Sequence, residues 1–277
     1  MERLTNTMKK FSLGGKVALG VLTSFLILAV FAGLLTTHPH EIPSGPGLVP
    51  PSGDHFLGTD DLGIDLWAQL VYGTRISLLV GLSTALISVA LGGSLGIIAG
   101  YYGGGVDEKI MALVDMMLVV PQLPTMVVLG GFFGPSIVNI VLVLSLFSWA
   151  RPARMVRSRI LSLKEEPFIN IAKSYGGGIF YITRKHFMPE IFALLMVSFI
   201  RLISRAVVAE AGLSFLGLGD PTNKSWGLIL NHALGFRGIY FTDFWKWWVI
   251  SPLLFIILLV LSVSFISKEV ENIYLGR

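Results

Sequence analysis

Residues 151–189 read RPARMVRSRILSLKEEPFINIAKSYGGGIFYITRKHFMP, the one long polar segment between long apolar ones. Eight of its residues are Lys or Arg, out of 21 in the whole protein. Lys and Arg are enriched in the cytoplasmic loops of membrane proteins. The sequence therefore predicts that this stretch, which we call the basic segment, lies on the cytoplasmic side of a membrane.

The composition of the 277-residue chain is that of an integral membrane protein. Hydrophobic residues make up 53% of the chain and charged residues only 14%, whereas charged residues are about a quarter of a soluble domain. The net charge of +4 sits at the ends of apolar runs, which argues against nucleic-acid binding. The chain has no cysteine, which excludes disulfides, thiolate metal sites and cysteine nucleophiles.

Six apolar runs predict membrane helices. They cover residues 17–35, 76–101, 110–133, 136–150, 191–213 and 249–266. The first run could also be a cleavable signal peptide, but it is long for one and no small-x-small cleavage site follows, so we expect a retained helix. Small residues in the second run allow close helix packing in lipid. Pro121 and Pro124 should break the third.

The stretches 38–70 and 214–246 predict external loops. The first contains five prolines and several glycines, which exclude a long helix. Three histidines, His38, His40 and His55, raise the question of a metal site. None has an acidic or histidine partner at ligand spacing on a regular element, so we expect ordinary loop histidines and no metal. The second loop ends in the aromatic cluster 241–248, which is typical of a membrane interface.

The distribution of Lys and Arg predicts the topology. With both termini in the cytoplasm, fifteen of these residues lie inside, including Arg3, Lys9, Lys10 and Arg277, and four lie outside. The remaining two fall within the fifth span. This asymmetry favours six helices with both ends inside.

Within the basic segment, the pattern predicts two short helices around a glycine corner. Two glutamates precede Pro167, and both residue types favour a helix start. The helix should end at Tyr175, because the glycines 176–178 follow. Residues 179–186 can form a second helix, and Pro189 should open the fifth span. From the residues alone, a docking surface for a soluble partner and a solvated loop that only fixes orientation both remain open.

Several motifs then indicate a family. Asn170-Ile171-Ala172, with Gly176 and Pro189, resembles the EAA loop of binding-protein-dependent ABC importer permeases. Residues 55–63, HFLGTDDLG, are similar to the H-x-x-G-T-D-x-x-G stretch of the branch that moves dipeptides, oligopeptides and nickel. Further similar stretches follow in order at 73–78, 154–157, 210–219 and 225–227. Within the branch, the C-type permease is the closer likeness.

The chain departs from the family pattern at three positions. Asn170 replaces the usual acid and Ile171 the usual alanine, so an ion pair made by that acid must be absent or supplied elsewhere. Ile64 stands where the branch usually has arginine before Asp65.

The resemblance implies an all-α membrane protein with six transmembrane helices, both termini cytoplasmic and a type I ABC importer permease fold. Residues 1–75 would hold the first helix and the external loop, and residues 76–277 the transport core, with the cytoplasmic coupling loop at 151–189. The residues implied to couple transport to the ATPase are Asn170, Ile171, Ala172, Gly176, Gly177 and Pro189.

The implied assembly lies in a prokaryotic cell membrane. Its other parts are a second homologous permease in a heterodimer, two ATPase subunits and an extracytoplasmic substrate-binding protein. ATP and Mg belong to the ATPases, because this chain has no G-x-x-x-x-G-K-S/T loop. We therefore expect no catalytic residue, no cofactor and no enzymatic activity in this chain.

Charges at membrane depth are costly and usually face a bundle interior or a wet cavity. Arg201 and Arg205 are one helical turn apart, hence on one face. Glu210 lies close to that face, and Asp115 lies in the third span. All four could line a translocation path, in which the arginines attract a substrate carboxylate. The alternative is structural pairing, which we favour for Glu210 and Asp115.

The function that the sequence supports is a permease subunit that forms half of the path of an ATP-driven importer of short peptides. The same machinery could import nickel chelates or oligosaccharides. An ion-coupled secondary transporter should show an internal repeat and paired broken helices, and neither is apparent. An intramembrane hydrolase is disfavoured because no histidine falls inside a predicted span.

Overall fold

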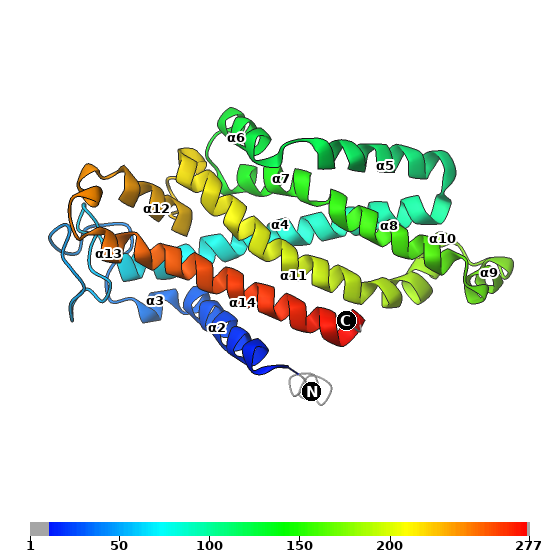
Figure 1. Ribbon diagram of the computed structural model, residues 1–277, viewed down its shortest axis with the longest axis horizontal. Helices are drawn as coiled ribbons and strands as arrows, with labels where there is room; N and C mark the ends of the chain where they lie inside the picture. The colour runs from blue at the N-terminus through cyan, green and yellow to red at the C-terminus, as the bar shows by residue number, and fades with distance from the viewer. Residues whose placement is uncertain (1–10, 276–277) are drawn as a thin grey trace.

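The computed structural model describes residues 11–275 as an elongated bundle of helices (Figure 1). Arg3, Lys9, Lys10 and Arg277, counted above for the topology, lie outside the described residues. Within the described part the chain forms helices and no strand. The longer helices are α2 (Leu13–Val30), α4 (Leu66–Tyr102), α5 (Gly104–Val119), α6 (Gln122–Phe133), α7 (Ile137–Ser148), α8 (Ala150–Lys164), α9 (Pro167–Ser174), α11 (Met188–Leu213), α12 (Trp226–Gly235) and α14 (Ile250–Leu275). The shorter ones are α3 (Ala32–Leu35), α10 (Ile179–Ile182), α13 (Trp245–Trp248), the π-helical turns η1 (Thr183–Phe187) and η2 (Ser214–Leu218), and the 3₁₀ turn η3 (Arg237–Tyr240).

Between residues 11 and 275, five helices are long and apolar enough to cross a membrane, and there are six if the bent pair α5 and α6 counts as one span. This agrees with the six predicted spans. The start of α2 lies beside the end of α14, where Ser12 donates a hydrogen bond to Glu269. The two described ends of the chain therefore lie on the same side of the bundle. That this side is the cytoplasm stays a prediction.

The centre of the bundle is the contact between α4 and α8, which lie side by side in Figure 1. Gly92, Gly96 and Gly100 face α8 at one-turn intervals. A Cβ at these positions would lie 2.3 Å from the Trp149 carbonyl oxygen, 2.5 Å from that of Ala153 and 2.7 Å from the Ile160 Cβ. The glycines therefore let the two backbones touch, as the small residues of this span predict.

α4 begins ten residues before the predicted second span, so the prediction that the external loop extends to residue 70 is wrong. Asp65 caps the helix, because its Oδ1 accepts a hydrogen bond from the Ala68 backbone N–H at 2.8 Å. Its first turns are buried at Leu66, Ala68 and Leu70, and α12 packs against this helix. One continuous helix thus crosses residue 75, where the boundary between the N-terminal part and the transport core was expected.

The third predicted span is broken as expected. α5 and α6 meet at an angle of 90°. Val120 has an extended backbone, the conformation that a following proline favours, and Pro121 occupies the position just before α6.

The fourth predicted span does not end at residue 150. α7 runs on into α8 through Trp149, whose backbone stays helical (φ −73°, ψ −26°), to make one 28-residue rod over residues 137–164. The first part of the basic segment is therefore a packed helix and not a loop. It stays ordered because Ala153, Val156 and Ile160 are buried against α4, while the basic residues face outward.

The predicted separate helix over residues 179–186 is also wrong in form. α10, η1 and α11 make one continuous helix over residues 179–213. Pro189 has no N–H for the usual bond to the carbonyl four residues back. The preceding turn widens to a π-turn, in which the Met188 N–H bonds to the Thr183 carbonyl five residues back. A π-turn absorbs the proline, so the helix is not interrupted.

The end that we predict to be external, at the left of Figure 1, is more structured than a loop. α12 folds back against α4 and α11, and its buried Trp226 donates a hydrogen bond from Nε1 to the Leu70 carbonyl at 3.0 Å. The aromatic cluster 241–248 divides: Phe241 is 90% exposed, but Trp248 is fully buried against Phe236. The interfacial belt predicted for this cluster therefore does not include Trp248, which is a core residue. The charged tail predicted from Lys268 onward is helical through Leu275.

Candidate functional site

A tight glycine turn follows α9 at the far end of the molecule (Figure 1). The Gly176 N–H donates to the Lys173 carbonyl and the Gly177 N–H to the Ala172 carbonyl, both at 2.9 Å. This pair of bonds defines a Schellman turn. Gly176 has a φ of +81°, and a Cβ on Gly177 would lie 2.6 Å from the Ala172 oxygen. The turn therefore needs glycine at both positions.

α9 is fixed to the bundle through its apolar side. Ile169 is fully buried in a cluster with Ile160, Ile182 and Phe187. The opposite side faces outward, so Asn170 and Ile171 are exposed. α9 therefore presents the positions of the EAA resemblance to a partner rather than to the core.

Beside the turn lies a groove of about 550 Å³. Its side-chain walls are Phe168, Ile171, Ala172, Tyr175, Tyr181 and His186, and its floor is the turn Gly176–Gly178. Tyr175 is 89% exposed at its rim. The structure thus brings four of the predicted coupling residues to this groove, while Asn170 lies on the exposed side of α9 and Pro189 lies in α11. Their part in ATPase coupling stays a prediction.

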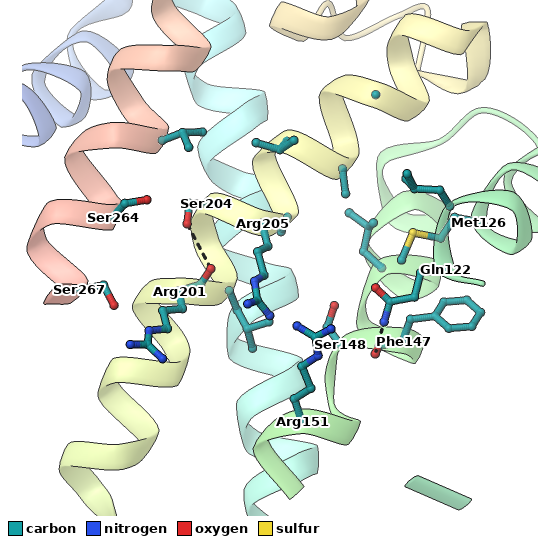
Figure 2. A pocket seen from close by; sticks show the side chains of 18 of the residues that line it. Gln122, Met126, Phe147, Ser148, Arg151, Arg201, Ser204, Arg205, Ser264 and Ser267 are labelled. Atoms are coloured by element: carbon teal, nitrogen blue, oxygen red, sulfur yellow. Dashed lines mark hydrogen bonds between the residues drawn. The ribbon is translucent and has the colours of Figure 1, made fainter. Parts of the chain in front are cut away.

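A cavity of about 1060 Å³ lies between α7, α8, α11 and α14, with α6 at its edge (Figure 2). Both predicted path arginines, Arg201 and Arg205, line it, and Arg151 at the start of α8 joins them. The other walls combine apolar side chains with small polar groups. Among them are Met126, Leu144, Phe147, Val208, Gln122, Ser148, Ser204 and Ser264.

The three arginines of this cavity differ in their partners. Arg201 forms an ion pair with Glu271 of α14, and its side chain points away from the other two (Figure 2). Figure 2 shows the guanidinium groups of Arg205 and Arg151 turned toward one another. No carboxylate among residues 11–275 forms an ion pair with either Arg205 or Arg151.

The two predicted path acids do not line this cavity. Glu210 is 1% exposed and accepts a hydrogen bond from the Ser214 hydroxyl at 2.6 Å. Asp115 forms an ion pair with Arg154, and Asp107 on the same helix pairs with Arg157. These two pairs fasten α5 to α8. Glu210 and Asp115 thus each have a partner within the described chain, and the structural role that we favoured for them stays a prediction.

The three histidines of the predicted external loop have partners that their spacing in the sequence did not reveal. His55 is buried and its Nδ1 lies 2.8 Å from Asp65 Oδ2, while His38 Nε2 lies 2.9 Å from the Asp54 carbonyl oxygen. His40 stacks on Tyr72 at 3.6 Å between ring centroids, and burial lowers its pKa. His38, His55 and Asp65 come close enough for a metal ion to bridge them. Each of these groups already has a hydrogen-bond partner, so the absence of a metal stays our prediction.

Sequence reasoning missed three charged residues of the cavity, Arg151, Lys268 and Glu271. Arg151 directly follows an apolar run, and that position was taken as the start of a cytoplasmic loop. Glu271 was assigned to a short polar tail, because nothing in the sequence links it to Arg201 seventy positions earlier. These residues could be assigned to the cavity only once it was known that α8 and α14 continue as helices beyond the predicted ends of the spans.

The family signature covers the cavity and the glycine turn together. The profile described as "Binding-protein-dependent transport system inner membrane component" matches residues 92–271, well over half of the chain. The chain belongs to this family. As a member, the permease is an inner membrane component of a binding-protein-dependent transport system, whose other parts include a substrate-binding protein and ATPase subunits. The predicted multi-pass membrane location and the family resemblance are confirmed.

Named relatives of the permease are similar along most of the chain. A dipeptide transport system permease protein DppC of Alkalihalophilus pseudofirmus is 34% identical, over 92% of this chain and 83% of its own. The DppC of Haemophilus influenzae is 33% identical, over 91% of this chain and 89% of its own. A glutathione transport system permease protein GsiD of Pectobacterium atrosepticum is 36% identical, over 66% of this chain and 61% of its own.

Proposed function

We propose that this permease forms half of the translocation path of an ATP-driven importer of short peptides. The observation that carries the proposal is the cavity of about 1060 Å³ lined by Arg151, Arg201 and Arg205. It lies at the upper end of the roughly 300–1,000 Å³ of pockets for drug-sized molecules. Apolar walls suit peptide side chains, and the arginines suit a carboxylate. Relatives named for dipeptide and glutathione transport support the same substrate class.

The second half of the path would come from a homologous permease in a heterodimer. Support comes from the unpartnered apolar face of α5 and α6, where Val119 is 82% and Phe132 83% exposed. Such a face needs either lipid or another helix as its partner. α6 lies at 90° to α5. The exposed apolar side chains of the two helices therefore extend in two directions and not along one helix.

Coupling to ATP would pass through α9 and the Schellman turn at Gly176 and Gly177. The groove between α9 and Tyr181 is aromatic and exposed, which suits a protein surface on an ATPase. ATP and Mg would be held by the ATPases, and this chain would supply only the docking surface. The absence of catalytic activity in this chain is part of the same proposal.

The test is ATP-driven uptake by the complete transporter, with both permeases, both ATPases and the binding protein, in proteoliposomes. Labelled trialanine should enter only when ATP and Mg are present on the ATPase side. Accumulation of a nickel chelate or an oligosaccharide without trialanine uptake would show that this compound, and not a peptide, is the substrate. Uptake by this chain alone, driven by an ion gradient without ATPases, would indicate a secondary transporter instead.

A further inference from the structure

The arginines of α8 and α11 fall into two groups within the described chain. Arg154, Arg157, Arg159 and Arg201 pair with Asp115, Asp107, Glu190 and Glu271 respectively. Arg151 and Arg205 have no acidic partner among residues 11–275. These two line the same cavity and turn toward one another (Figure 2). Pairing thus leaves Arg151 and Arg205 unneutralised in this cavity, whose α14 wall also carries Lys268.

Two like charges facing each other across a partly desolvated cavity raise its free energy unless an anion lies between them. A carboxylate accepts hydrogen bonds from guanidinium groups in a bidentate geometry that a single lysine cannot provide. The cavity offers no competing acid at this point, because Glu271 is held by Arg201. The arrangement therefore has the charge and the donors of a carboxylate site.

Arg151 also connects the cavity to a second one. A neighbouring cavity of about 740 Å³ has its polar lining on α8, at Arg151, Arg154, Arg159, Ser158 and Ser162, and apolar walls that include Leu118 of α5 and Leu194 of α11. Arg151 is the residue common to both cavities, at the junction of α7 and α8. A carboxylate that leaves Arg205 while still bonded to Arg151 would reach the second cavity without losing its positive partner.

We propose that Arg205 and Arg151 bind the C-terminal carboxylate of a peptide in transit, and that Arg151 hands it from the larger cavity to the smaller. This rests on the proposed function and deepens it. Arg201, in contrast, is a structural residue that ties α11 to α14 through Glu271. The site recognises the end group common to all peptides, so it discriminates free acids from neutral end groups and not one side chain from another.

The test compares trialanine with its C-terminal amide in proteoliposomes that contain the complete transporter. Uptake is divided by the fraction of binding protein loaded with each peptide, measured separately, so that selection by the binding protein cancels. We expect the wild type to prefer the free acid by about tenfold, the worth of a charge-assisted hydrogen bond. In Arg205→Gln and Arg151→Gln, uptake of the free acid should fall and the preference should shrink to less than about twofold. Arg205→Lys, which keeps the charge, should retain part of the preference.

The control is Lys109→Gln, which removes an equal charge from an exposed position on α5, and it should keep the wild-type preference. A preference that is unchanged in Arg205→Gln, with normal assembly and ATP hydrolysis, overturns the inference. An equal loss of both peptides also overturns it, because it indicates that the arginines pair with a partner subunit or a lipid headgroup. If the wild type moves neither peptide, the proposed function itself fails. If it moves both without preference, only the carboxylate site fails.

Discussion

The backbone of Gly92 lies directly against the carbonyl oxygen of Trp149, where a Cβ would approach to 2.3 Å. This contact joins α4 to the point where α7 becomes α8. It repeats at Gly96 against the Ala153 carbonyl oxygen, and at Gly100 against the Ile160 side chain, so α4 and α8 are in close contact along this whole face.

Gly92→Ala should loosen this contact. The added methyl meets backbone rather than a flexible side chain, so we expect destabilisation of about 1–3 kcal/mol, the usual cost of overpacking. Thermal unfolding of the purified protein in detergent measures it. Gly20→Ala on α2 is the matched control, because a Cβ there meets nothing within 4 Å. Equal melting temperatures for the two variants would contradict the close approach.

Gly176→Ala and Gly177→Ala should weaken coupling at the Schellman turn. The first forces a side chain into left-handed geometry, which costs about 1–2 kcal/mol, and the second clashes with the Ala172 oxygen. In the complete transporter we expect less peptide uptake per ATP hydrolysed. Gly178→Ala should behave as wild type, because its backbone φ is −74° and its surroundings are open. A larger defect at position 178 than at 176 would rule out the turn as the cause.

The absence of cysteine makes the topology directly testable with single introduced cysteines. Tyr175→Cys and Phe241→Cys replace side chains that are 89% and 90% exposed at opposite ends of the molecule. In intact cells whose outer membrane has been made permeable, a membrane-impermeant maleimide should label position 241 at once. Position 175 should react only after the inner membrane is broken. The reverse pattern would invert the predicted orientation.

Arg75 should hold the external end of α2. Its Nε donates to the Ala29 carbonyl at 2.5 Å and its Nη2 to the Val30 carbonyl at 3.1 Å, which satisfies the C-terminal end of that helix. In Arg75→Gln, the loss of charged hydrogen bonds worth about 1–3 kcal/mol should speed amide exchange in α3. Hydrogen exchange with mass spectrometry measures this. Arg237→Gln, at an exposed position on η3, should leave the exchange of α3 unchanged.

The positions of the spans were predictable because apolar length is a property of the sequence itself. The break at Pro121 was equally predictable, since proline removes a donor and restricts the residue before it. The helix ends were less so. Charge marks where a span is predicted to end, but the chain stays helical beyond Trp149 because one side of α8 still packs on α4.

The pairing of charges could not be predicted from the sequence. Spacing placed Arg201 and Arg205 on one face and treated them alike, whereas Glu271, seventy positions away, distinguishes them in the structure. The same holds for His55, whose partner Asp65 is brought close by the fold of the external loop rather than by a regular element. The spacing of residues within one helix shows which of them share a face. It does not show which residues of another helix will pair with them.

The helical continuity at Trp149 has a mechanical consequence. Residues 137–164 form a rod of 28 residues, about 42 Å long at roughly 1.5 Å per residue. Arg151 lies along it, and α9 follows its end after only two residues. Because α7 and α8 follow one another without an intervening loop, a tilt applied at the α9 end would also displace Arg151. A movement of the glycine turn would then be accompanied by a movement of Arg151 at the cavity.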